Sequence, residues 1–447
     1  MRWSLCALAV LLLSARSTVR AQAPAVIASA VSYSLDVNTT ASPVAFQQTI
    51  GATGATFLTV HFSRFHLAPG DKVIVRSLDN ATVYEYDNLG RGDLGESGGF
   101  FSSVVTGSNL VLEYAPASEP EIAVGDFGFT IDKLTRSSSS ASLATTCGTD
   151  DTLPAKCYQN DSALPLAYST SQAVARLFVN GTTSCTGWLV GSEGHLITNN
   201  HCIDGAAAAA MTDYEFMAES ASCEEQCEIK NGCRGVVAST TATLVATDED
   251  LDYTLVKLTP ASTANLSDYG FLKLRVAGAA LGEQIYLPQH PKGWAKRIAA
   301  AVDDGNATTV IGVDHSSACG DHRIGYYADT QAGSSGSPVI ASTDNAVIAL
   351  HNCGVLDDNC ENSAIDIRSV IYDLRERDIV PADALDDPTA EIPVGAWLPG
   401  VTSAPSPTPT PAPTASVCAI FRQQSTCENV LPGKVCVWNG SACVANT

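Results

Sequence analysis

Three short segments of the sequence carry residue types that together could cleave an amide bond by nucleophilic attack. They contain, in chain order, the histidine His201, the aspartate Asp252 and the serine Ser335. A serine hydroxyl becomes an effective nucleophile when a neighbouring base accepts its proton, and a carboxylate must hold that base in the correct tautomer. The sequence supplies one residue for each role, so it predicts acyl transfer through a covalent acyl-enzyme intermediate.

The residues that flank the serine and the histidine support this interpretation. Ser335 lies in residues 333–338, whose sequence is Gly-Ser-Ser-Gly-Ser-Pro. A loop that directs amides at one point often needs backbone dihedrals that only glycine adopts at little cost. His201 ends the run Leu-Ile-Thr-Asn-Asn-His at residues 196–201. Each feature alone is usually structural, so the prediction rests on their occurring together in this order.

The three segments, in the order His, Asp, Ser, resemble the trypsin-like serine endopeptidases of the chymotrypsin fold, over about residues 147–378. The Gly-Ser-Ser-Gly-Ser-Pro run and His351, in the strand after the serine, are similar to the bacterial lysyl endopeptidase-like and glutamyl endopeptidase-like branches. Residues 285–298 resemble the lysyl branch in particular. The resemblance implies an all-β, chymotrypsin-like double β-barrel that hydrolyses proteins or peptides without a cofactor or a metal.

The resemblance also implies a role for each matching residue. Ser335 would attack the carbonyl, His201 would act first as base and then as acid, and Asp252 would orient the imidazole. The backbone amides of Gly333 and Ser335 would form the oxyanion hole. Asp250 is a rival for the acid, but only Asp252 stands directly before the apolar run that the family pattern requires.

Three residues are expected at the specificity pocket, and they favour different substrates. Asp329 lies six residues before Ser335, where trypsin-like enzymes place the aspartate that pairs with Lys or Arg. Thr330 and His351 match residues that hold a substrate carboxylate in glutamyl endopeptidase-like enzymes. An aspartate attracts a cation strongly in a partly dry pocket, so we expect cleavage after basic residues. The alternatives are a glutamate-preferring endopeptidase and a catalytically silent, protease-like extracellular binding module.

The residue before the nucleophile departs from trypsin. Trypsin has an aspartate there that pairs with a freed N-terminus, whereas this chain has Ser334 and no Ile-Val-Gly-Gly start. That activation switch is therefore absent. If the protein is made as a precursor, removal of its N-terminal domain would have to act by uncovering the cleft.

The cysteines are expected to form disulfides. Of fifteen, Cys6 falls in the predicted signal peptide, which leaves an even fourteen in an oxidising compartment. A zinc site at Cys223, Cys227 and Cys233 is the weaker alternative. The resemblance implies a bridge from Cys185 to Cys202, beneath the base. By analogy with family positions it also suggests Cys319–Cys353 and Cys147–Cys360.

Composition divides the chain into several parts. The expected parts are a signal peptide at 1–21, a β-sandwich accessory domain at 24–133, a linker at 134–146, the protease domain at 147–387, a Pro/Thr-rich linker at 388–417 and a small four-cysteine module at 418–447. Short helices are expected at 206–210 and 367–377. The sandwich resembles the β-rich domain that precedes the protease in bacterial lysyl endopeptidase-like proteins.

The bulk properties fit an exported protein that acts on other proteins. The formal charge of −22 excludes nucleic acid and anionic membrane surfaces as natural partners. Seven Asn-x-Ser/Thr sequons suggest a secreted glycoprotein. Contact with glycan or cell wall through the flanking modules is a further expectation.

Overall fold

The computed structural model describes residues 24–40, 44–88, 90–91, 99–118, 125–137, 144–146, 148–317, 320–354, 361–393, 396–398, 436–438 and 443–445. The predicted signal peptide lies outside these residues, as do most of the Pro/Thr-rich linker and the C-terminal module. The chain forms two compact units, residues 1–399 and 400–447. Across the described residues, no helix is both long enough and apolar enough to span a bilayer.

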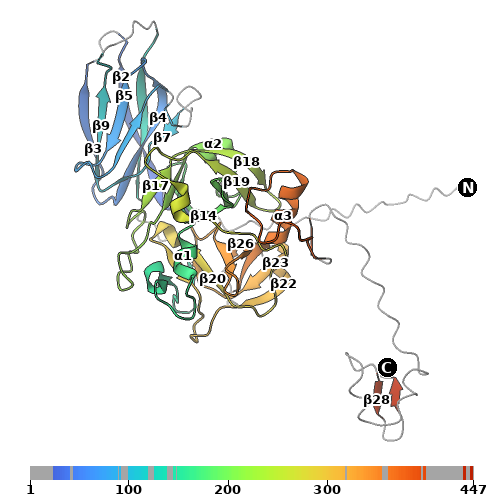
Figure 1. The fold of residues 1–447 in the computed structure, drawn as a ribbon. Coiled ribbons are helices and arrows are strands. Elements are labelled where there is room, and N and C mark those ends of the chain that lie inside the picture. The colour runs from blue at the N-terminus through green and yellow to red at the C-terminus, as the bar shows by residue number, and fades with distance from the viewer. Residues whose placement is uncertain are drawn as a thin grey trace, which may run out of the picture. The chain divides into compact units, whose positions relative to one another are not determined.

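The N-terminal part of the first unit is a β-sandwich, drawn in blue in Figure 1. One sheet contains β2 (Ala28–Asn38), β10 (Gly128–Ser137), β4 (Phe57–His66), β7 (Phe100–Phe101) and β8 (Val105–Thr106). The other contains β3 (Phe46–Gly51), β9 (Asn109–Ala115), β5 (Lys72–Arg76) and β6 (Val83–Tyr86). Alternate residues of these strands face a single apolar core, as expected where one face of each sheet is buried.

The sandwich does not begin and end where its composition predicted. Its last strand, β10, continues to Ser137 because Leu134 and Thr135 are buried against the neighbouring strand β4. The segment Ala25–Val26 forms β1, which pairs with a strand of the protease domain instead of the sandwich. The first residues of the predicted linker, 134–137, therefore belong to β10. The first residues of the predicted sandwich, Ala25–Val26, belong to the first sheet of the following domain.

The protease domain contains two eight-stranded antiparallel sheets, which confirms the predicted all-β double barrel (Figure 1). Besides β1, the first sheet contains β13 (Val174–Val179), β14 (Thr183–Val190), β15 (His195–Thr198), β16 (Thr212–Phe216), β17 (Val236–Ser239), β18 (Ala242–Asp248) and β19 (Tyr253–Leu258). The second contains β12 (Leu153–Pro154), β20 (Ile285–Gln289), β21 (Arg297–Ala299), β22 (Val310–Ser317), β23 (Gly320–Tyr326), β25 (Pro338–Ala341), β26 (Val347–Gly354) and β27 (Asn362–Asp366). One apolar cluster joins Trp188 of the first sheet to Ile340 and Leu350 of the second, so the two barrels share a core.

Short helices connect and close the barrels. They are α1 (Ala167–Ser171), α2 (Ala206–Ala210) and α3 (Ile367–Glu376), with 3-10 turns η1 (Ala155–Tyr158), η2 (Leu266–Tyr269) and η3 (Pro291–Gly293). The two predicted helices are thus present. α3 buries residues spaced three and four apart, and Asp366 caps it by accepting a hydrogen bond from the backbone amide of Arg368. In the second unit, β28 (Cys436–Trp438) pairs with β29 (Cys443–Ala445).

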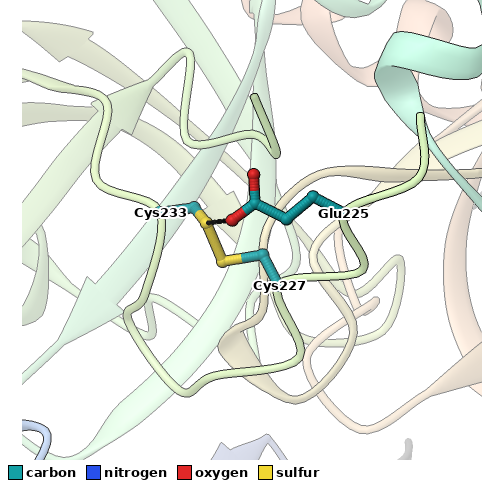
Figure 2. A group of neighbouring side chains, drawn as sticks. All are labelled: Glu225, Cys227 and Cys233. Atoms are coloured by element: carbon teal, nitrogen blue, oxygen red, sulfur yellow. Dashed lines mark hydrogen bonds between the residues drawn. A yellow bond between two sulfur atoms is a disulfide. The ribbon is translucent and has the colours of Figure 1, made fainter. Parts of the chain in front are cut away.

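Three disulfides join described residues: Cys157–Cys223, Cys185–Cys202 and Cys227–Cys233. Glu225 lies beside the last of these, with a carboxylate oxygen 3.6 Å from Cys233 Sγ. Figure 2 shows the two sulfurs bonded to each other. Sulfurs joined in a disulfide offer no thiolate to a metal, so the cysteine cluster is a crosslinked loop.

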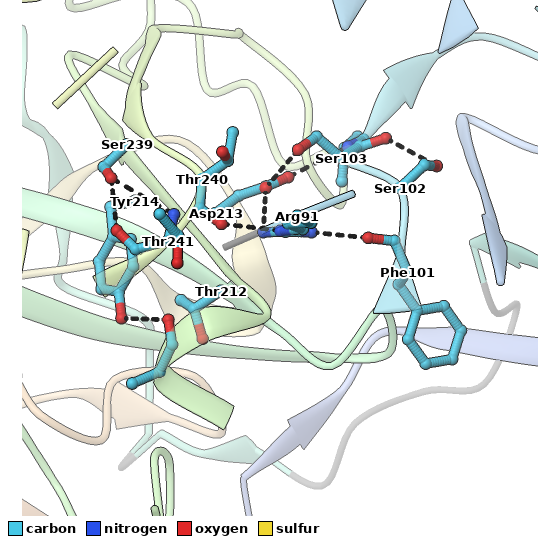
Figure 3. Close-up of polar contacts among 12 residues, drawn as sticks. Arg91, Phe101, Ser102, Ser103, Thr212, Asp213, Tyr214, Ser239, Thr240 and Thr241 are labelled. Atoms are coloured by element: carbon cyan, nitrogen blue, oxygen red, sulfur yellow. Dashed lines mark hydrogen bonds and ion pairs between the residues drawn. The ribbon is translucent and has the colours of Figure 1, made fainter. Parts of the chain in front are cut away.

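A buried ion pair joins the sandwich to the first barrel (Figure 3). Arg91 Nη2 lies 2.6 Å from Asp213 Oδ1, and the two side chains are 2% and 3% exposed. Arg91 also donates to the carbonyl oxygens of Phe101 and Thr240. Asp213 accepts from the Ser103 hydroxyl at 2.8 Å. Every charged atom at this contact therefore has a partner, which is the condition for burying an ion pair without a large penalty.

Apolar contacts surround this ion pair. Ile27, Phe57 and Val104 pack with Phe178 of β13 in one small cluster. Beside it, β1 extends the first barrel's sheet by pairing with β14. The sandwich is thus attached by strand pairing, by apolar packing and by a buried charge at the same time.

Removing Arg91 should weaken this junction strongly. In Arg91→Ala, Asp213 stays buried without its cation, and loss of one partner of such a pair costs about 3–5 kcal/mol. Urea unfolding followed by far-ultraviolet circular dichroism measures the change. The matched control is Arg64→Ala, because Arg64 pairs with a 77%-exposed Asp126 and should lose less than about 1 kcal/mol. Equal losses in the two variants would contradict the prediction.

Candidate active site

The structure brings His201 and Asp252 together at the ends of two neighbouring strands. His201 follows β15 and Asp252 precedes β19, and these strands pair with Thr198 opposite Thr254. His201 Nδ1 lies 2.9 Å from Asp252 Oδ2 and 3.0 Å from Oδ1. The backbone amide of His201 also donates to Oδ1 at 3.0 Å. The carboxylate therefore holds both the ring and the main chain of the histidine.

Asp252 is itself held in an unusual conformation. Its φ is +45°, in the left-handed region that aspartate tolerates better than most residues. Asn199 Nδ2 donates to its carbonyl oxygen at 2.9 Å, and Asn352 Nδ2 donates to its Oδ2 at 3.0 Å. Asp252 is buried, whereas the rival Asp250 is exposed in the preceding turn. Asn199 and Asn352 were not among the residues selected from the sequence.

Ser335 lies in the loop between β24 (Thr330–Gln331) and β25, and it is fully buried. Its Oγ and His201 Nε2 each form no hydrogen bond with the described residues. Its carbonyl oxygen lies 3.9 Å from the sulfur of Cys202, the neighbour of His201. The segments that carry His201 and Ser335 therefore meet at Cys202, and no hydrogen bond joins the histidine ring to the serine hydroxyl.

Thr186 of β14 attaches the loop that contains Ser335 to the first barrel by hydrogen bonds. Its backbone amide donates to the carbonyl oxygen of Ser335 at 2.9 Å, and its hydroxyl donates to the carbonyl oxygen of Gly333 at 2.9 Å. The same hydroxyl accepts from the backbone amide of His290 at 3.0 Å. Thr186 is fully buried. Sequence reasoning missed it, although it directly follows Cys185, which was selected.

Two glycines shape the serine loop. Gly333 has φ +101°, and a Cβ there would lie 2.9 Å from the carbonyl oxygen of His290. Gly336 has φ +88°, and a Cβ there would lie 2.0 Å from the carbonyl oxygen of Thr186. Either substitution would push the loop off its support. The structure records no acceptor within the described residues for the amides of Gly333 and Ser335, so both remain available to a ligand.

Asp329 is buried, and its carboxylate is engaged. Oδ2 accepts from the backbone amide of Asp151 at 2.7 Å, and Gln289 Nε2 donates to the Asp329 carbonyl oxygen at 2.7 Å. The residue lines a cavity of about 280 Å³ together with Asp303 and Asp304. Burial, followed by repulsion from neighbouring carboxylates with Asp303 first, raises the pKa of Asp151. Three aspartates, Asp303, Asp304 and Asp329, therefore line the same cavity.

Thr330 and His351, the other two predicted pocket residues, are also buried. The Thr330 hydroxyl donates to Asn362 Oδ1 at 3.0 Å, and Asn362 Nδ2 donates to the carbonyl oxygen of Ala328. His351 Nδ1 lies 2.7 Å from the Tyr326 hydroxyl. Burial, with a smaller contribution from His201, lowers the pKa of His351 to about 3. His351 is therefore a neutral ring at physiological pH.

The Cys185–Cys202 disulfide lies where the resemblance implied, tying β14 to the segment that carries His201. Cys353 is also disulfide-bonded. Cys147, Cys319 and Cys360 fall outside the described residues, so the other two suggested bridges stay predictions.

Comparison with known proteins agrees with this geometry. Residues 185–350 match the model of the trypsin-like peptidase domain. A secreted RxLR effector protein of Plasmopara viticola, number 73, is 40% identical over 343 residues, which cover 74% of this chain and 82% of that protein. At this identity and coverage, the chain and the Plasmopara viticola effector belong to one protein family. It carries a trypsin-like peptidase domain that includes Thr186, His201, Asp252 and Ser335.

One further protein and one solved structure match shorter stretches of this chain. The uncharacterized protein y4fB of Sinorhizobium fredii is 32% identical over 177 residues, which cover 38% of this chain and 25% of that protein. Among solved structures, the inactive form of the Rv3671c protease of M. tuberculosis is 15% identical with a TM-score of 0.34, over 48% of this chain and 95% of that one. The matches do not separate the lysyl from the glutamyl branch.

The buried His351 should make the trypsin-like peptidase domain sensitive to acid. The unfolded chain takes up a proton at this ring below its ordinary pKa of 6.5, whereas the folded chain does so only near pH 3. Folding stability should therefore fall as the pH drops from 6.5 towards 3, by up to about 1.4 kcal/mol per pH unit for one proton. Urea unfolding at several pH values measures this slope.

His351→Gln should reduce the slope by about one proton. His66→Gln, at an exposed histidine, serves as the control and should leave the slope as it is. A slope unchanged by His351→Gln would contradict the assignment of His351 as the titrating group.

Proposed function

We propose that the chain is a secreted serine endopeptidase that hydrolyses peptide bonds through His201, Asp252 and Ser335. The observation that carries this proposal is the arrangement around the serine. A histidine held by a buried carboxylate faces a loop whose serine hydroxyl and two backbone amides have no acceptor among the described residues. His201 follows a strand of the first barrel and Ser335 precedes a strand of the second, so base, nucleophile and anion-binding donors would come from different strands, as acyl transfer requires.

The proposed reaction uses each of these groups in turn. Ser335 Oγ attacks the scissile carbonyl while its proton passes to His201 Nε2. The oxygen of the tetrahedral intermediate receives hydrogen bonds from the amides of Gly333 and Ser335, each worth about 100-fold to 1,000-fold in rate. His201 then gives its proton to the leaving amine, and the acyl-enzyme is hydrolysed by water in the reverse order of proton transfers. Asp252 stabilises the imidazolium throughout.

We propose that the enzyme cleaves after Lys or Arg. Asp329, Asp303 and Asp304 line one cavity. Burial, followed by repulsion from neighbouring carboxylates, raises the pKa of Asp151, whose amide donates to Asp329. Such a site attracts a cationic side chain and repels glutamate. A glutamate carboxylate would be repelled by the three aspartates. Hydrogen bonds from the neutral His351 and from Thr330, whose hydroxyl already bonds to Asn362, would not offset that repulsion.

Export and glycosylation complete the proposal. The N-terminal apolar segment supports secretion, and the matching Plasmopara viticola protein is itself named as secreted. Sequon asparagines Asn38, Asn80, Asn160, Asn265 and Asn306 are exposed and therefore accessible to glycosylation.

Labelling by a fluorophosphonate probe tests the catalytic proposal. The wild-type chain should react covalently, and Ser335→Ala should lose this labelling because it removes the hydroxyl that His201 would activate. Ser192→Ala removes an exposed surface serine and should label like the wild type. A chain that never labels at Ser335 would instead be a silent, protease-like binding module.

A peptide-library digest tests the specificity. Cleavage should follow Lys and Arg, and Asp329→Asn should lower kcat/KM for these substrates by roughly 100-fold, because truncating one partner of a desolvated charge pair costs 2–5 kcal/mol. Asparagine still accepts the Asp151 amide, so fluorophosphonate labelling should persist. Asp268→Asn, an exposed aspartate, is the charge control. Cleavage after glutamate that survives Asp329→Asn would favour the glutamyl alternative.

A further inference from the structure

We propose that residues 144–146 and 148–152 form a brace that holds the loop 329–335 in its working shape in the uncut chain, with Asp150 as a positioning residue for that loop. The inference rests on the proposed function, since the loop contains Ser335 and its two amides. It deepens that function by stating how the site is ordered.

Three contacts join the brace to the loop. The backbone of β11 (Ala144–Thr145) pairs with β24, with Ala144 opposite Gln331 and Thr145 opposite Thr330. Gln331 Nε2 donates to Asp150 Oδ2 at 2.9 Å. The amide of Asp151 donates to the Asp329 carboxylate at 2.7 Å. Each of the three consecutive residues 329–331 is therefore held by β11 or by the Asp150–Asp151 segment that follows it.

The brace is anchored on its other side by the second barrel. Asp150 Oδ1 accepts from both the amide and the hydroxyl of Thr152, at 3.1 and 2.6 Å. The buried Arg297 of β21 donates through Nε to the same Thr152 hydroxyl at 2.6 Å. Immediately afterwards the chain enters β12, which pairs with β21. The Asp150 carboxylate is thus fixed by Thr152 through one oxygen while it holds Gln331 through the other.

Gln331 transmits this restraint to the nucleophile. The backbone amide of Gln331 donates to the Ser334 hydroxyl at 3.1 Å. The backbone amide of Ser334 donates to the backbone carbonyl oxygen of Gln331 at 2.8 Å. These two bonds close the turn from Gln331 to Ser334, which Ser335 follows directly. Loss of the Asp150 bond would leave the Gln331 side chain, which is 2% exposed, with an unpaired buried amide.

The brace explains how the loop is ordered although the trypsin switch is absent. A freed N-terminus cannot pair with Ser334, because a hydroxyl offers no charge to an ammonium group. The brace restrains the loop in the uncut chain, so no peptide bond has to be cleaved before the loop is ordered. Its contacts lie C-terminal to β10, so they are independent of any cut between the sandwich and β11.

Labelling of the uncut chain is the first test. A site for a sequence-specific protease is placed between β10 and β11, and fluorophosphonate-labelled bands are compared before and after the cut. The full-length chain should label before the cut, at a rate that the cut leaves within twofold. Labelling only after the cut would overturn the brace while leaving the proposed function standing. No labelling in either state would overturn the proposed function itself.

A double-mutant cycle is the second test. Asp150→Ala and Gln331→Ala should each slow labelling and lower kcat about tenfold, and the double variant should be no slower than either single one, because both remove the same bond. Asp150→Asn keeps an acceptor oxygen and should recover most of the rate. Asp161→Ala is the matched control, because Asp161 also caps a turn, at Ala163 and Leu164, and should keep the wild-type rate.

Thermal unfolding of the same variants separates positioning from general stability. The melting temperatures of Asp150→Ala and Asp161→Ala should be similar, whereas only Asp150→Ala should react slowly. Additive rate losses in the cycle, or rate losses that follow the melting temperature, would overturn the role of Asp150.

Discussion

The hydrogen bonds of Thr186 are the contact on which the active site depends. His201 belongs to the first barrel and Ser335 to the second, so their separation is set wherever the two barrels meet. Thr186 meets the serine loop with its amide and its hydroxyl, and its own carbonyl oxygen accepts from the Thr198 hydroxyl at 2.8 Å. Since Thr198 lies in the strand that leads to His201, one buried residue connects the base to the nucleophile.

The contacts of the N-terminal region are those expected of a lasting part of the chain. A segment destined for removal would be expected to leave little buried charge behind, whereas here Asp213 would be left inside the first barrel without Arg91. Removal would also strip β1 from β14. Removal of this domain to uncover the cleft is therefore unfavourable. It would leave the Asp213 carboxylate unpaired and would expose the edge of β14 that β1 covers.

The sequence predicted what depends on local pattern. The strands around His201, Asp252 and Ser335 and the helices at 206–210 and 367–377 follow from residue type and short-range spacing. The reactive roles of the three residues stay a prediction. The end of β10 at Ser137 and the place of β1 depend on pairing with distant strands, so composition alone could not locate them. Thr186 escaped notice for the same reason, because its hydroxyl partner Gly333 lies 147 residues away.

Electrostatics gives the brace its particular form. Asp150 and Asp151 lie beside Asp303 and Asp304, and their mutual repulsion opposes the close packing of this segment. Hydrogen bonds from neutral donors hold three carboxylates of this region. Gln331 Nε2 and the Thr152 hydroxyl donate to Asp150, and the backbone amides of Thr149 and Asp151 donate to Asp303 and Asp329. The negative charge is thereby kept beside Asp329, where a cationic substrate would experience it.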